Sequence, residues 1–139
     1  MSVMPTYPAT MPMGEMIREL GSSLVSPVAD DWRGRLRHLL DPLREAFAEH
    51  RAATEGDDGL YAGLVYDAPR LARTVDDLVA EHHLLDTAMA RLARAADEVN
   101  QDAETLLMGV LAVLDHLNRH RQSDADLVLE AYVTDIGGE

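Results

Sequence analysis

Three histidines occupy positions at which buried faces of helices are expected. His50, His82 and His120 each fall within a stripe of apolar residues that recurs at alternating spacings of four and three. That spacing keeps side chains on one face of an α-helix, so each histidine is expected to point inward with its leucines. A buried imidazole is costly without a partner, and a metal ion or a hydrogen-bonding carboxylate is the usual remedy.

Acidic residues accompany all three histidines. Each histidine is followed four or five residues later by Asp or Glu, and a further histidine stands four residues before His120. Two helical residues at that separation are neighbours and can reach one ion. Imidazole and carboxylate ligands together suit iron, manganese or zinc, and facing helices of a bundle can hold two ions bridged by carboxylates. The predicted metal ligands are His50, Glu55, His82, Asp86, His116, His120 and Asp124.

The same pattern has a simpler interpretation. Each histidine can be a core residue that is hydrogen-bonded to its own acidic neighbour, with no metal present. That interpretation is favoured for any one histidine alone, whereas three histidines at matching heights favour a metal. Tyr61 and Tyr66 also approach the interior in this arrangement, and ordinary packing is their expected role.

The order of apolar stripes predicts an all-α, antiparallel up-down helical bundle. Residues 1–13 are expected to form a flexible tail, and residues 14–139 a single bundle domain whose first helix is short. The turn at 100–102 is short enough to require antiparallel neighbours. Long helices are predicted from about Ser26 to Glu55 with a kink or break at Pro42, from Pro69 to about Val99, and from Ala103 to Tyr132, with a short helix through 60–65.

The heights of the histidines along these helices can be compared by counting residues. His82 lies 18 residues before Asn100, and His120 lies 20 residues after it. At about 1.5 Å of rise per residue, the two histidines are expected within about 3 Å of the same level. His50 reaches that level if the segment 57–66 stacks end to end on the first long helix.

Composition limits the kinds of partner. A chain of 139 residues with a net charge of −13 is expected to form one domain and not to bind nucleic acid or anionic membranes. The absence of cysteine excludes disulfides and thiolate ligands. No signal-peptide pattern and no apolar run of about 20 residues is present, so a cytoplasmic protein is expected.

The order and separation of three segments resemble the hemerythrin-like (HHE cation-binding) family. The resemblance covers roughly residues 30–139, and the ending from Asp126 is similar to that of small actinobacterial members. The segments that carry it are Glu49-His50 to Glu55 with Gly59-Leu60-Tyr61, Pro69 to Glu81-His82-His83-Leu84-Leu85, and His116 through His120 to Asp124.

The resemblance implies a four-helix bundle with a non-haem iron site that binds oxygen, nitric oxide or peroxide. It implies His50, His82 and His120 as ligands, with Glu55 and Asp124 in the place of the bridging carboxylates. The family's first helix also supplies a histidine, but none precedes residue 38 here, and the spacings after His50 and His120 differ by one residue from the family's. One iron ion and two iron ions therefore both stay open.

Three functions follow from these observations. The first is a cytoplasmic iron-binding bundle that binds or senses a small diatomic molecule or peroxide. The second is a metal-free bundle that serves as an interaction or regulatory module, and the third is an enzyme that decomposes peroxide at a metal centre. A homodimer is a further expectation, because a short first helix leaves a core that a second copy can complete.

Overall fold

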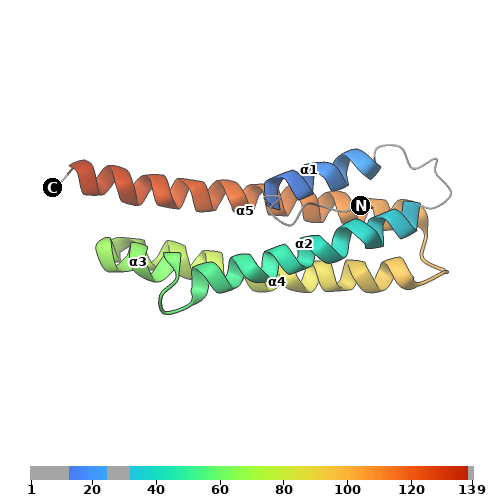
Figure 1. Ribbon diagram of the computed structural model, residues 1–139, viewed down its shortest axis with the longest axis horizontal. Helices are drawn as coiled ribbons and strands as arrows, with labels where there is room; N and C mark the ends of the chain where they lie inside the picture. The colour runs from blue at the N-terminus through green and yellow to red at the C-terminus, as the bar shows by residue number, and fades with distance from the viewer. Residues whose placement is uncertain (1–12, 25–31, 138–139) are drawn as a thin grey trace, which may run out of the picture.

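All regular structure in the described part of the chain is helical. The computed structural model describes residues 13–24 and 32–137. Among these residues, no helix is long and apolar enough to cross a membrane. The elements are α1 (Met13–Leu24), α2 (Trp32–Glu55), α3 (Leu60–Asp67), the 3-10 turn η1 (Pro69–Leu71), α4 (Ala72–Asp97) and α5 (Ala103–Gly137) (Figure 1).

Four helices contact one another in the cyclic order α1, α2, α4, α5. The long helices α2, α4 and α5 run along the length of the molecule, and α1 lies beside only one half of α5 (Figure 1). Beyond the end of α2, the short helix α3 packs against α2, α4 and α5. The fold is therefore a helical bundle in which α1 and α3 support opposite halves.

The apolar core consists of two clusters of buried residues. The larger cluster joins α1, α2, α4 and α5, and the smaller one joins α3, η1, α4 and α5. Along α4 the residue His82 separates Leu78 of the smaller cluster from Leu85 of the larger one, and both leucines are buried. Along α5 the fully buried His120 lies between Leu117 and Leu127 in the same way. The two imidazoles thus form a polar layer between two apolar ones.

The helix boundaries follow the sequence pattern closely. The stripe from Met13 predicts α1, whose Met16, Ile17 and Leu20 are buried, and the predicted end at Glu55 is confirmed. At the start of α5, the Asp102 carboxylate accepts a hydrogen bond from the Thr105 backbone N–H at 3.0 Å, which satisfies one of the free donors there.

Two expectations about α2 have different outcomes. The helix continues from Trp32 to Glu55 through Pro42, so a break is wrong, and the alternative of a kink stays a prediction. The predicted start at Ser26-Pro27 and residues 1–12 of the predicted tail lie outside the described residues, whereas the last residue of that tail, Met13, begins α1.

Gly59 sets how closely the chain can return after α2. A Cβ at this position would lie 2.7 Å from the Thr54 carbonyl oxygen and 2.9 Å from that of Ala53. Both atoms belong to the backbone of α2 and cannot rotate away. The start of α3, and with it Tyr61, is therefore held in place by the absence of a side chain at residue 59.

We expect Gly59→Ala to lower the free energy of unfolding by about 1–3 kcal/mol, because the added methyl group must displace backbone. Gly63→Ala is the matched control within α3. A Cβ there meets no atom within 4 Å, so this change should stabilise the protein by about 0.5–1 kcal/mol through helix propensity. Urea denaturation of the three proteins measures both effects, and equal stabilities would contradict the close approach.

Candidate metal centre

Three helices bring three imidazole rings together. His50 on α2, His82 on α4 and His120 on α5 have ring centroids 4.7 to 5.6 Å apart. One nitrogen from each ring can be chosen so that all three nitrogens lie within 4.8 Å of one another. His82 and His120 are fully buried, and the His50 side chain is 23% exposed. The predicted match in height between His82 and His120 is confirmed.

Two aromatic side chains pack against this group of imidazole rings. Phe47, one turn before His50, has its centroid 5.5 to 6.3 Å from all three imidazoles. Tyr61 from α3 stacks on His82 at 5.9 Å with an interplanar angle of 20°. Both aromatic residues are at most 2% exposed, so they restrict the rotation of the imidazoles and exclude water from two sides.

Carboxylates from neighbouring helices hold the outer nitrogens of the two buried rings. His82 Nδ1 lies 2.5 Å from Glu55 Oε2, and His120 Nδ1 lies 2.5 Å from Glu81 Oε1. Burial alone would raise the pKa of Glu55, but hydrogen bonds from His82 and Arg51 outweigh it and lower that pKa. The pKa of Glu81 is lowered against burial in the same way, by hydrogen bonds from His120 and His116. Both carboxylates are therefore ionised acceptors at neutral pH, and the Nδ1 atoms donate.

This arrangement leaves two lone pairs facing each other. A neutral imidazole that donates from Nδ1 has an unprotonated Nε2. The Nε2 atoms of His82 and His120 are 3.0 Å apart in the buried interior. Burial lowers the pKa of His82, and the nearby His120 and His50 lower it further, despite the hydrogen bond to Glu55. A second proton on His82 is thus disfavoured.

Asp124 brings one carboxylate oxygen to the same place. Its Oδ2 is 3.0 Å from His50 Nε2 and 3.3 Å from His120 Nε2. The first pair is close but not oriented as a hydrogen bond, and both atoms are buried without a hydrogen-bond partner among the described residues. Unpaired buried polar atoms are rare, and a metal ion is one explanation for them.

The other oxygen of Asp124 is occupied by Tyr61. The phenol donates to Oδ1 at 2.5 Å. Burial, together with the carboxylate of Asp124, raises the pKa of Tyr61, so the phenol keeps its proton at neutral pH. Burial would raise the pKa of Asp124, but the imidazole of His50 at 3.0 Å and the hydrogen bond from Tyr61 lower it below its usual value, so this carboxylate is ionised.

The remaining predicted ligands lie around this group and not within it. Glu55 contacts His82 and not His50, the histidine that precedes it on α2. His116 Nε2 is 3.3 Å from Glu81 Oε2 at the partly exposed edge. The Asp86 side chain is 56% exposed and pairs with Arg51 at 3.7 Å. Of the seven predicted ligands, the structure brings four together, namely His50, His82, His120 and Asp124.

Two contacts were missed from the sequence. Glu81 directly precedes His82 and so lies outside the apolar stripe of α4, and only the packing of α5 brings His120 beside it. Tyr61 was expected to do no more than pack. Its position at the start of the short helix after a glycine loop was the available signal, but the partner on α5 is 63 residues away.

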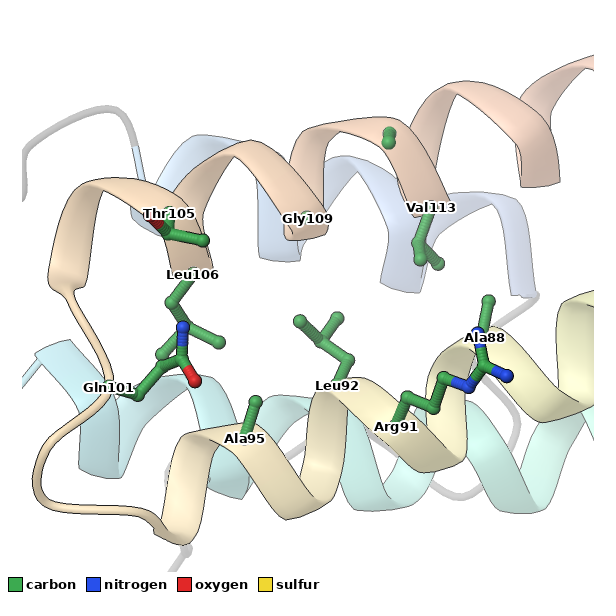
Figure 2. Close-up of a pocket in the computed structure, with 10 residues that line it drawn as sticks. Ala88, Arg91, Leu92, Ala95, Gln101, Thr105, Leu106, Gly109 and Val113 are labelled. Carbon is green, nitrogen blue, oxygen red and sulfur yellow. The ribbon is translucent and has the colours of Figure 1, made fainter.

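A separate apolar groove lies between α4 and α5 (Figure 2). Its volume is about 350 Å³, and it is lined by small and aliphatic side chains that include Ala88, Leu92, Leu106 and Gly109. Among the described residues that line it, Arg91 is the one charged residue, and none of the three clustered histidines contributes. The groove is therefore distinct from the imidazole group.

Comparisons with known proteins assign no family. No protein-family model, no curated protein and no solved structure matches this chain. The interpretation of the site therefore rests on its own geometry.

The metal-free protein should lose stability as the pH falls. Because the pKa of His82 is lowered in the folded protein, the unfolded chain binds a proton near pH 6.5 that the folded chain does not. The free energy of unfolding is therefore highest above that pH and falls below it. A difference of one bound proton corresponds to about 1.4 kcal/mol per pH unit.

Urea denaturation at pH 7.5 and pH 5.5 in the presence of a chelator measures this loss. It should be smaller in His82→Leu and unchanged in His83→Gln, whose parent side chain is exposed. A loss of the same size in all three proteins would contradict the assignment to His82.

Proposed function

We propose that this chain is a metal-binding helical bundle that holds one transition-metal ion between α2, α4 and α5. The proposed ligands are the Nε2 atoms of His50, His82 and His120, with Oδ2 of Asp124. The observation that carries the proposal is the 3.0 Å separation of two buried Nε2 atoms whose rings each donate from Nδ1 to a carboxylate. Two nitrogens bound to one ion at about 2.0–2.1 Å are expected about 3.0–3.4 Å apart, so His82 and His120 need little movement relative to each other.

The surrounding carboxylates support this proposal. In metal sites, a ligating histidine usually donates its other ring N–H to a carboxylate, which orients the ring and increases its basicity. Glu55 does this for His82, and Glu81 does it for His120. A metal-free core could satisfy Nδ1 in the same way, but it would leave the Nε2 atoms of the buried His82 and His120 facing each other at 3.0 Å.

One ion is favoured over two. In a site with two bridged ions, Glu55 would be expected to bridge the metals. Here Glu55 and Glu81 are hydrogen-bonded to the Nδ1 atoms of His82 and His120. Asp124 is therefore left as the carboxylate directed at the centre. Mixed imidazole and carboxylate ligands suit iron, and we propose non-haem iron as the ion.

The proposed task is to bind or sense a small diatomic molecule or peroxide. Four protein ligands leave room in the coordination of iron for an added ligand. Phe47 and Tyr61 close two sides of the centre, so a small molecule fits better than a large one. The cyclic order in which the helices contact one another, α1, α2, α4, α5, supports the up-down, hemerythrin-like arrangement that this proposal includes.

Metal content per chain tests the site. The protein purified without a histidine tag should bind one iron ion, and His82→Gln and Asp124→Asn should lose it, as measured by elemental analysis after dialysis. His83→Gln is the control, because His83 is the exposed neighbour of His82 and should not matter. Metal-free protein in every case would favour the alternative function, an interaction module whose histidines are core residues.

Glu81→Gln tests the outer carboxylates. The amide cannot hold His120 Nδ1–H as strongly, so iron affinity should fall by about 10–100-fold while one ion still binds at saturation. Titration against a competing chelator measures the change. An unchanged affinity would show that Glu81 does not orient a metal ligand.

Nitric oxide binding tests the proposed task. Iron-loaded wild-type protein should bind nitric oxide with a change in its visible absorption spectrum, and the metal-free protein should not. An iron-loaded protein without a spectral response to nitric oxide, oxygen or peroxide would contradict a sensing role.

A further inference from the structure

Tyr61 is the one buried polar side chain that α3 contributes to the centre. The side chain is 2% exposed, and no other residue of Leu60–Asp67 is buried. Its ring stacks on His82, and its hydroxyl group donates to Asp124 Oδ1 at 2.5 Å. The residue therefore contacts two of the four proposed ligands from outside the ligand set.

The two carboxylate oxygens of Asp124 have different partners. Oδ1 faces the phenol, and Oδ2 faces His50 Nε2 at 3.0 Å and His120 Nε2 at 3.3 Å. A carboxylate with both oxygens free can bind a metal ion through both of them. An oxygen that accepts a short hydrogen bond from a rigid, stacked phenol is held away from that second bond.

We propose that Tyr61 is a positioning residue that restricts Asp124 to coordination through Oδ2 and so keeps one position open for an added ligand. This inference rests on the proposed metal site. α3 thereby takes part in the chemistry of the site, because its Tyr61 hydroxyl group sets how many bonds the protein makes to the ion. The phenol itself stays outside the coordination shell.

The variant Tyr61→Phe removes the hydroxyl group and keeps the ring that stacks on His82. Tyr66→Phe is the matched control, since Tyr66 lies on the same helix and is 86% exposed. Cobalt(II) is a suitable probe ion, because its visible absorption depends on the number and geometry of its ligands. Azide serves as the added ligand, and circular dichroism checks that each variant keeps its helices.

Wild type and Tyr66→Phe should bind one cobalt ion with the same spectrum and the same azide affinity. Tyr61→Phe should also bind one ion, but with an altered spectrum and an azide affinity lower by about 10-fold or more, since Asp124 then occupies the open position. Identical spectra and azide affinities in all three proteins would overturn the inference while leaving the metal site intact.

Two further results have separate meanings. A strong visible band in the iron(III) protein that disappears in Tyr61→Phe would show that the phenolate is itself a ligand, which would overturn a positioning role. If the wild-type protein binds no cobalt and no iron, the proposed function fails and this inference fails with it.

Discussion

The arrangement of the whole centre depends on two lone pairs that face each other in a buried space. When Glu55 and Glu81 accept from the Nδ1 atoms and both rings are neutral, the Nε2 atoms of His82 and His120 carry unshared electron pairs 3.0 Å apart. Water cannot solvate them, since both side chains are fully buried. A positive charge between the rings removes this repulsion, and a metal ion supplies more charge than a proton does. The ionised carboxylates around the rings increase the attraction for a cation.

The polar layer of imidazoles lies within a well-packed apolar core. Apolar clusters lie on both sides of the imidazoles along α4 and α5, and Phe47 packs against all three rings. Dense packing allows few rotamers, so the nitrogens keep their directions. The half of the bundle supported by α3 differs from the half supported by α1, because α3 brings a hydroxyl group to the centre and α1 brings apolar side chains.

The contacts also bear on why the proposed site departs from the two-ion pattern that a hemerythrin-like resemblance leads one to expect. Glu55 stands one residue further from His50 than that pattern has it, and it reaches across to α4, where His82 is its partner. A rotation of about 100° per residue around the helix moves a side chain to a different face, so one inserted residue is enough to change the partner. In the proposed site, this carboxylate orients a ligand and is not free to bridge two ions.

The sequence by itself determined the helices, their buried faces and the common height of His82 and His120, because each of these follows from periodicity and from the rise per residue. The height of His50 also required residues 57–66 to stack on the first long helix. The sequence predicted α1, α3 and the end of α2 closely, and it brought His50, His82, His120 and Asp124 into one candidate set. It did not determine which carboxylate meets which imidazole. Glu81 and Tyr61 find partners 39 and 63 residues away, and such contacts depend on how each helix is rotated against its neighbours. Only packing in three dimensions decides that rotation, since local spacing carries no information about the facing helix.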